Sequence, residues 1–239
     1  LLVEAMMKEG LSQEEAINRI FLFDSHGLVT KDREGLTPLK QKFAHELEPQ
    51  STFLDAIGEV KPTAIVGCAA QAGSFNAYVL SAMARINERP IIFALSNPTS
   101  RSECTAREAY TYTEGKCLFA SGSPFPQVEL NGKTFIPRQS NNSYVFPGIG
   151  LGLVTASPRV VPQSVFLSAA EALSKKVSDE DLENGSLFPS LTKIREVSQS
   201  IAAAVAEECF TAGVAGVPKP KDLSEAIQAA MYKPVYAQI

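Results

Sequence analysis

Two loops of this sequence carry amide side chains that are suited to binding a small polar ligand. Asn97 follows an apolar run at residues 90–95 and precedes Pro98. Proline biases the residue before it towards extended geometry, which would aim the Asn97 amide into the crevice beyond the end of a strand. A neutral amide can donate a hydrogen bond to a carboxylate or pair with a carboxamide. An ordinary Asn-Pro turn is the structural alternative.

The second amide loop spans residues 139–144 and lies between Pro137 and the apolar segment at 145–148. It contains two adjacent asparagines, Asn141 and Asn142, whose side chains suit recognition of a carboxylate. Asx turns, in which each side chain bonds only its own backbone, are the alternative.

A carboxylate and several cations form a third candidate site. Asp24 ends an apolar run at residues 20–23, where a carboxylate can accept hydrogen bonds from the ribose hydroxyls of a dinucleotide. Ser25 follows it, and three cations come soon after in the sequence: Lys31, Arg33 and Lys40. Two unit charges 4 Å apart interact by about 4 kcal/mol at an effective dielectric of about 20. One lysine would therefore cancel the repulsion between Asp24 and the 2′-phosphate of NADP. A capped turn with solvated cations is the alternative.

A turn of small residues at 67–73 begins with Gly67 and joins an apolar run to a helical pattern. Its lack of bulky side chains would let a nucleotide approach the backbone N–H groups. Close packing of helix on strand explains the same residues equally well.

The apolar pattern predicts strands that alternate with helices. The expected strands are residues 20–23, 63–68, 90–95 and 117–120, and the expected helices between them are 75–86 and 105–112. This alternation predicts an α/β fold: a doubly wound, Rossmann-like, mostly parallel sheet with helices on both faces, which binds ligands at the carboxyl ends of its strands.

Weaker patterns complete the expected elements. Ser12 and Glu15 form a capping box after an initial helix, and Asn131-Gly132 predicts a hairpin turn. A helical C-terminal segment follows, with helices at 163–176, from 178, and at 192–210. We predict a dinucleotide-binding domain at residues 1–212 and a C-terminal tail at 213–239 that lies over the surface or against a partner.

Composition argues against several classes of partner. The net charge of −4 and the lack of a Lys/Arg-rich run argue against nucleic acid. The longest nearly apolar stretch, 148–156, is too short and too rich in glycine to cross a membrane, and the N-terminus does not resemble a signal peptide. We therefore expect a protein of the cytoplasm or an organelle matrix that is not secreted.

Neither the cysteines nor the histidines predict a metal site. The four cysteines form no C-x-x-C pair, and the two histidines, His26 and His45, are far apart in the sequence. We expect the cysteines to be reduced and mostly buried.

Several of these stretches together resemble the malic enzyme family. The matching stretches, in family order, are FDS at 23–25, FAHE at 43–46, INERP at 86–90, FALSNPT at 93–99, ECT at 103–105, FASGSPF at 119–125 and NNSYVFPG at 141–148. They identify the chain as similar to the C-terminal NAD(P)-binding part of that family.

The resemblance implies oxidative decarboxylation of L-malate to pyruvate and CO2, with reduction of NADP or NAD. It implies that Asn97 contacts substrate and nicotinamide, that Asn141 binds malate beside Asn142 and also faces the cofactor, and that Asp24 lies at the ribose. Ser25 and Lys40 resemble the members that prefer NADP, so NADP is the expected cofactor and NAD the alternative.

The resemblance also implies groups that precede Leu1 in the family. These are the Gly-rich loop, the catalytic Tyr and Lys, and the Glu and Asp ligands of Mg or Mn, so we expect no catalytic or metal-binding residue here and an inactive chain on its own. The implied partners are the N-terminal domain of the same protein and further copies in a homo-oligomer. A non-catalytic nucleotide-binding or interaction module and another two-domain NAD(P)-dependent dehydrogenase remain as alternatives.

Overall fold

The computed structural model describes residues 1–233, which form two compact units. The first unit comprises Leu1–Ser140 and Asp179–Leu187, and the second comprises Asn141–Ser178 and the described residues from Phe188 onward. The described chain runs through the first unit, enters the second after Ser140, returns briefly, and then completes the second unit.

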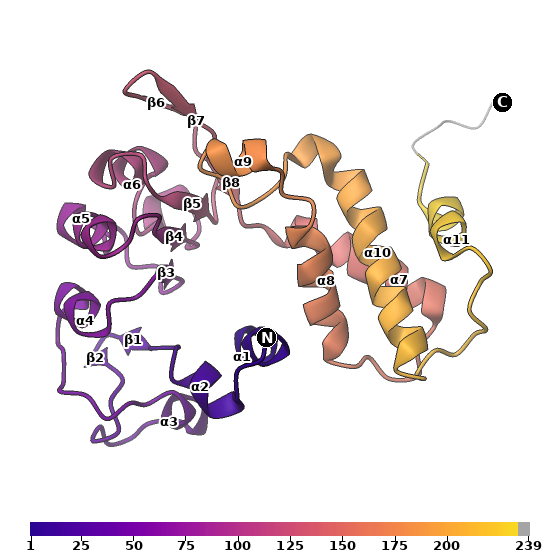
Figure 1. The fold of residues 1–239 in the computed structure, drawn as a ribbon, viewed down its shortest axis with the longest axis horizontal. Helices are drawn as coiled ribbons and strands as arrows, with labels where there is room; N and C mark the ends of the chain where they lie inside the picture. The colour runs from indigo at the N-terminus through magenta and orange to yellow at the C-terminus, as the bar shows by residue number, and fades with distance from the viewer. Residues whose placement is uncertain (234–239) are drawn as a thin grey trace. The chain divides into compact units, whose positions relative to one another are not determined.

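A parallel sheet is the centre of the first unit (Figure 1). Its strands are β3 (Ala64–Gly67), β4 (Ile91–Ala94), β5 (Leu118–Ser121) and β8 (Arg138–Gln139), in the order β3-β4-β5-β8. All three pairings are parallel, with Ile65 opposite Ile92 and Ile92 opposite Phe119. Parallel strands of this kind place all their carboxyl ends at one edge of the sheet.

One face of this sheet packs against α5 (Ala77–Ile86) and α6 (Ala106–Tyr112). Ile65, Ile92 and Phe119 lie on that face and are buried with Leu80 and Met83 of α5. On the other face, burial increases across the sheet, because Val66 of β3 is half exposed whereas Ala120 of β5 is fully buried.

Shorter elements complete the first unit. They are α1 (Leu2–Lys8), α2 (Gln13–Ile17), β1 (Phe23–Asp24), β2 (Gly27–Leu28), α3 (Pro38–Lys42), α4 (Phe53–Val60), the 3-10 turn η1 (Thr99–Arg101), the hairpin of β6 (Val128–Leu130) and β7 (Lys133–Phe135), and α9 (Asp179–Glu183). The returning segment contacts the sheet, because Phe119 N–H donates to Gly185 O and Ile136 N–H donates to Asn184 O.

The second unit is helical. It contains η2 (Asn142–Tyr144), α7 (Phe146–Ala156), α8 (Ser164–Ser174), η3 (Leu191–Lys193), α10 (Ile194–Thr211) and α11 (Leu223–Ala230). Helix α10 packs against α7, α8 and α11. A Cβ atom added to Gly148 or Gly152 of α7 would come within 2.6 Å of Ile201 or of Ala202, so these glycines permit close approach of α7 and α10.

Most of the predicted elements are confirmed, and so is the Rossmann-like class. The strands from 63, 90 and 117 appear as β3, β4 and β5, and both hydrogen bonds of the Ser12–Glu15 capping box are present. Asn131 and Gly132 both have positive φ in the β6–β7 turn. Within the predicted tail, helix α11 contributes Ile227, which is fully buried, to the core of the second unit. Residues 234–239 of that tail lie outside the described residues.

The prediction of a buried parallel strand at residues 20–23 is wrong. Only Phe23 and Asp24 form a strand, β1, which pairs antiparallel with β2 and is half buried. The physical reason is a tight reversal: Asp24 Oδ1 accepts the His26 N–H, and Gly27 has a φ of +101° that other residues rarely adopt. The strand therefore finds its nearest partner four residues later and does not join the parallel sheet.

The boundary at residue 212 stays a prediction. The two compact units describe contacts within the chain, whereas the predicted boundary concerns which residues bind a dinucleotide.

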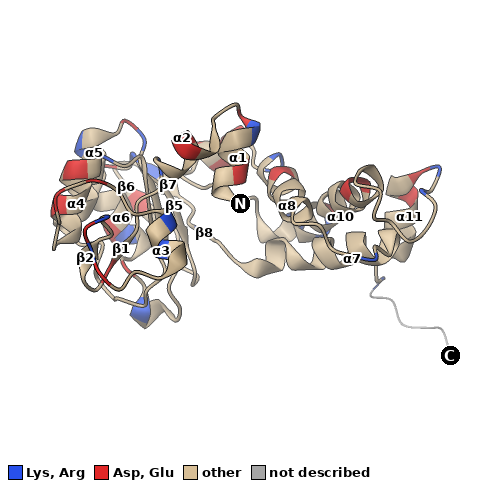
Figure 2. Ribbon diagram, turned by 90° about the horizontal axis from the view of Figure 1, so that it is seen from below, with Lys and Arg blue, Asp and Glu red and all other residues tan. Residues whose placement is uncertain are grey.

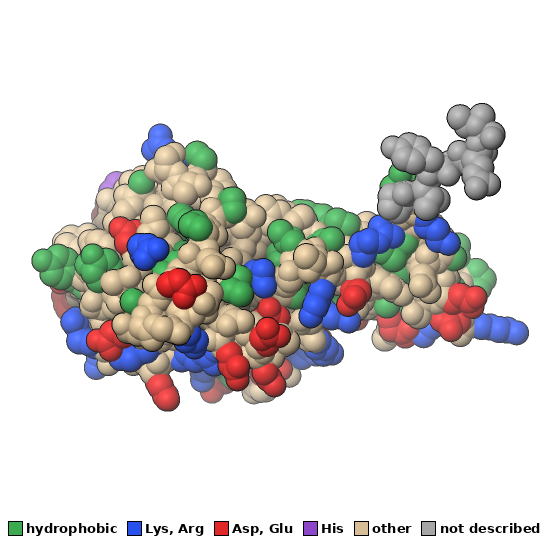
Figure 3. Space-filling view, turned by 90° about the horizontal axis from the view of Figure 1, so that it is seen from above, with side chains coloured by type: hydrophobic (Ala, Val, Ile, Leu, Met, Phe, Trp, Pro, Cys, Tyr) green, Lys and Arg blue, Asp and Glu red, His purple; other side chains and the backbone are tan. Residues whose placement is uncertain are grey.

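Basic and acidic residues are interspersed along the ribbon (Figure 2), and side chains of both charges appear on the face drawn in Figure 3. In residues 1–233, no helix combines the length and apolar character needed to cross a membrane.

Candidate functional site at the carboxyl edge of the sheet

The carboxyl edge of the parallel sheet brings together four segments that are distant in sequence. They are the turn after β3, Ser96 and Asn97 after β4, Gly122 and Ser123 after β5, and Ser140 after β8. The Ser140 N–H donates to Ser121 O at 2.8 Å, which fixes the last of these segments to β5. Ligands of open α/β sheets bind at this edge, so it is the candidate site.

Asn97 is exposed at this edge and is held by two neighbouring strands' ends. Its Oδ1 accepts a hydrogen bond from Ser123 Oγ at 2.7 Å, and its Nδ2 donates to Leu95 O at 3.3 Å. The Asn97–Pro98 peptide bond is cis. One amide proton and the remaining lone pair of the amide oxygen stay available to a ligand.

Gly122 is placed so close to Asn97 that no side chain fits there. A Cβ atom at Gly122 would lie 2.2 Å from Leu95 O and 2.6 Å from Asn97 Nδ2. The Gly122 N–H also donates to Ala94 O at 2.9 Å. The ends of β4 and β5 can therefore lie this close together only because residue 122 is a glycine.

Gly67 has a packing role in the structure. A Cβ atom there would lie 2.4 Å from the Glu103 carboxyl carbon. This contact fits the alternative of close packing, and the part of Gly67 in cofactor binding stays a prediction; the residues of the turn after it are exposed.

Asp24, Arg33 and Lys40 form one ion cluster in the region of β1, β2 and α3. Both oxygens of Asp24 accept from Arg33 at 3.1 Å, and Oδ2 also accepts from Lys40 Nζ. Ser25 Oγ is exposed beside His26 Nδ1 at 3.2 Å. Lys31 belongs elsewhere, because it pairs with Glu46 at 2.8 Å.

The cluster holds the Asp24 carboxyl in its ionised form. Partial burial raises its pKa, but the hydrogen bonds from Lys40, Arg33 and the His26 N–H outweigh burial, and the pKa lies well below its ordinary range. Two cations facing one carboxylate leave one unit of positive charge in excess. That excess is the kind of environment that a phosphate group requires.

Asn141 and Asn142 lie at the start of the second unit and are exposed. Asn141 Oδ1 accepts the Ser143 N–H at 2.9 Å and caps the 3-10 turn η2, so the predicted Asx-turn alternative is present at this residue. Because Asn97 belongs to the first unit, the convergence of the three amides stays a prediction.

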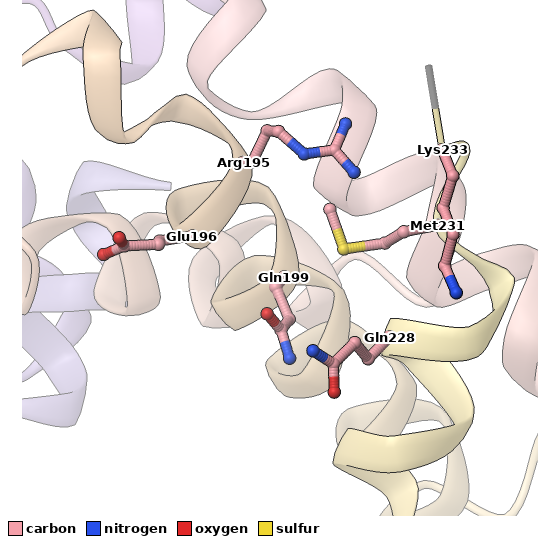
Figure 4. A pocket seen from close by; sticks show the side chains of 6 residues that line it. All are labelled: Arg195, Glu196, Gln199, Gln228, Met231 and Lys233. Carbon is pink, nitrogen blue, oxygen red and sulfur yellow. The ribbon is translucent and has the colours of Figure 1, made fainter. Parts of the chain in front are cut away.

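Two hollows of the described chain contain none of these residues. One, of about 200 Å³, lies between α10 and α11 in the second unit, and Figure 4 shows its lining: Arg195, Glu196, Gln199, Gln228, Met231 and Lys233. The other, of about 560 Å³, adjoins Arg89 and Cys117 at the amino ends of β4 and β5. The amino ends lie opposite the edge where α/β sheets bind ligands, so the exposed carboxyl edge remains the better candidate.

The described residues offer no ligand set for a divalent metal. Within residues 1–233, no group of three or more His, Cys, Asp and Glu side chains is placed so that it could hold a metal ion.

Three residues of this edge were not singled out by their own sequence pattern: Ser123, Gly122 and Glu103. All three occur in the stretches FASGSPF and ECT. Those stretches marked them as part of a family motif, but only the structure shows that they surround Ser96 and Asn97.

A parallel sheet with the Asn97 amide and close-packed glycines at its carboxyl edge defines this chain as a Rossmann-like α/β protein of the nucleotide-binding kind. Residues 1–210 match the family model "Malic enzyme, NAD binding domain". The chain therefore belongs to the malic enzyme family.

Individual relatives agree with this assignment. The chain is 46% identical over 240 residues to the "NAD-dependent malic enzyme, mitochondrial" of Ascaris suum, which covers 100% of this chain and 37% of that relative. It is 48% identical over 238 residues to the "NADP-dependent malic enzyme" of Anas platyrhynchos, covering 99% of this chain and 43% of the relative. The chain thus spans about two fifths of the length of these relatives.

The fold also matches that of a solved structure. The crystal structure of Entamoeba histolytica malic enzyme superposes with a TM-score of 0.70 and 21% identity, over 95% of this chain and 43% of the other. At that identity, the match concerns the fold.

Proposed function

We propose that this chain binds NADP and forms part of the active site of an enzyme that converts L-malate to pyruvate and CO2. The observation that carries the proposal is the Asn97 amide, exposed at the carboxyl edge and fixed by Ser123 and Leu95. A fixed amide at this edge is a preorganised partner for a carboxylate or a nicotinamide carboxamide. The relatives named above as NAD- and NADP-dependent malic enzymes support the same reaction.

The reaction needs a hydride acceptor and an ordered dicarboxylic acid. NADP, when bound, accepts the hydride from C2 of malate, and the loss of CO2 then leaves pyruvate and NADPH. In this proposal Asn97 faces both the substrate and the nicotinamide, and Asn141 and Asn142 bind malate.

The cluster around Asp24 is the proposed site for the adenosine end of the cofactor. Asp24 would accept hydrogen bonds from ribose, while Ser25 and Lys40 would contact the 2′-phosphate. Lys40 already pairs with Asp24, so NADP would have to share or displace that ion pair. The excess positive charge of Arg33 and Lys40 favours the phosphate, which supports NADP over NAD.

Substitution of Lys40 by Gln tests the choice of cofactor. In the full-length protein, we expect Lys40→Gln to lower kcat/KM for NADP about tenfold or more and to leave kcat/KM for NAD within about twofold, because a charge-assisted contact to phosphate contributes about 1.5–3 kcal/mol. Lys42→Gln is the matched control, because Lys42 lies on the same helix and its ammonium group faces the Phe43 ring. An unchanged ratio of NADP to NAD activity in Lys40→Gln would refute the proposed role of Lys40.

Activity of the full-length protein tests the reaction itself. We expect malate-dependent reduction of NADP with release of CO2 and pyruvate, and little turnover of other 2-hydroxy acids. Binding of NADPH without any malate turnover would instead favour a nucleotide-binding module.

The remaining proposals concern the whole protein. We propose that the partners of this chain are the remainder of the same protein and further copies in a homo-oligomer, and that Mg or Mn is bound by residues outside this chain. The mitochondrial relative is compatible with an organelle matrix, and the cytoplasm is the alternative compartment.

A further inference from the structure

A buried carboxylate lies directly beneath the candidate site. The Glu103 side chain is 1% exposed, and both hydrogen bonds to its carboxylate within residues 1–233 come from Ser96, one from the backbone N–H at 3.3 Å and one from Oγ. No Lys, Arg or His of the described chain forms an ion pair with it. A carboxylate in such a place is costly unless its hydrogen bonds are well made.

The same glutamate joins two of the four segments that make up the edge. Ser96 Oγ donates to Glu103 and accepts the Ala70 N–H at 2.9 Å. The backbone oxygen of Glu103 accepts the Phe75 N–H at 3.0 Å, and its neighbour Ser102 accepts the Gly73 N–H at 3.2 Å. Glu103 is thus bonded to the end of β4 by its side chain and to the turn after β3 by its backbone.

The surrounding chain is shaped to accept this carboxylate. A Cβ atom on Gly67 would overlap the Glu103 carboxyl group, at 2.4 Å from its carbon and 2.8 Å from Oε1. An apolar side chain would fill the same space without the cost of burying a charge. The carboxylate also orients Ser96, because it accepts hydrogen bonds from both the Ser96 N–H and the Ser96 hydroxyl. The Ser96 Oγ lone pairs therefore remain available to accept the Ala70 N–H.

We propose that Glu103 is a positioning residue that, through Ser96, sets the geometry of Asn97 and of the 68–74 turn. This inference rests on the proposed function, in which Asn97 faces the nicotinamide and malate. Ser96 is joined to Asn97 by a peptide bond, and the Asn97 amide is held on its far side by Ser123. Loss of the Glu103 contact would therefore leave the Asn97 amide held by Ser123 on the β5 side and, on the β4 side, only by its longer bond to Leu95 O.

The first experiment compares Glu103→Gln and Ser96→Ala with the wild type in the full-length protein. Glu103→Gln keeps the size of the side chain but places an amide N–H donor opposite one of the two Ser96 donors. Ser96→Ala removes the hydroxyl group. We measure the Kd for NADPH by its fluorescence, and kcat and KM for malate. Glu108→Gln is the matched control, because Glu108 is an exposed glutamate that caps α6 through Thr105.

Each single variant is expected to raise the Kd for NADPH about tenfold and to lower kcat, which is the effect of one hydrogen bond of about 1.4 kcal/mol. The double variant Ser96→Ala with Glu103→Gln is expected to have a Kd for NADPH and a kcat no worse than those of the more impaired single variant, because both substitutions remove the same contact. The control is expected to keep Kd and kcat within about twofold.

A purely structural role for Glu103 predicts a different result. In that case the variants would lower the melting temperature, but the folded enzyme would keep its Kd and kcat, and this outcome would overturn the proposal. Effects that add in the double variant would also overturn it. If Glu103→Gln does not fold, Ser96→Ala decides, since it removes only one hydroxyl. A wild type that neither binds NADPH nor oxidises malate refutes the proposed function itself, and is recognised before any variant is made.

Discussion

Substitution of Gly122 by Ala should disturb the candidate site strongly, because the added methyl group has no space. The added carbon would lie 2.2 Å from Leu95 O, whereas ordinary contacts are 3.4–4 Å, so the two loops must separate by about 1 Å. Leu95 cannot yield easily, because its N–H donates to Gly67 O at 2.9 Å in the β3–β4 pairing. Overpacking of this kind costs about 1–3 kcal/mol, and the rigid neighbour places Gly122→Ala near about 3 kcal/mol.

Thermal unfolding measures this effect directly. A loss of about 3 kcal/mol corresponds to a fall in Tm of about 6–12 °C for a chain of this size. Gly58→Ala is the matched control, because Gly58 lies within α4 of the same unit and an added Cβ meets nothing within 4 Å. Alanine in a helix interior should stabilise by about 0.5–1 kcal/mol, so the control should raise Tm. An unchanged or higher Tm in Gly122→Ala would refute the geometry described for this edge.

Two further predictions concern titratable groups. Because the pKa of Asp24 is lower in the folded chain than its ordinary unfolded value of about 3.9, its contribution to stability is fully present above that value and is lost as the pH falls through the folded pKa. Asp24→Asn should therefore reduce the free energy of unfolding by about 1–3 kcal/mol at pH 7. Urea denaturation should show that this difference from the wild type shrinks below about pH 4. An equal difference at pH 3 and pH 7 would contradict the ion cluster. Burial raises the pKa of the Cys104, Cys117 and Cys209 thiols, that of Cys117 to about 12, whereas Cys68 is exposed. A disulfide reagent at pH 8 should thus modify one thiol per folded chain and the other three only after unfolding, and fast reaction of two or more thiols would count against the core packing.

The sequence predicted the helices and strands whose signals lie within a few neighbouring residues. The Ser12–Glu15 capping box, the Asn131-Gly132 turn and the strand ending before Asn97 all depend on contacts between residues close in the chain. The amide of Asn97 was also placed correctly at the end of a strand, because parallel strands and their connecting helices determine which edge collects the loops.

Helix α7 shows where sequence patterns fail. Residues 148–156 contain glycines that normally disfavour helices, so the pattern indicates only a short apolar segment there. The helix forms because Gly148 and Gly152 let α10 pack closely against it. Packing by a distant helix compensates for a weak local preference.

Pattern and spacing alone therefore determined the α/β alternation and named Asp24, Gly67 and Asn97, since hydrophobic periodicity and turn chemistry act over short distances. Tertiary structure decided that Asp24 lies in a small antiparallel ladder with Arg33 and Lys40, and that Glu103 holds Ser96 beneath the edge. These partners are separated by up to sixteen residues, and hydrogen bonds and ion pairs at such separations depend on how the whole chain packs.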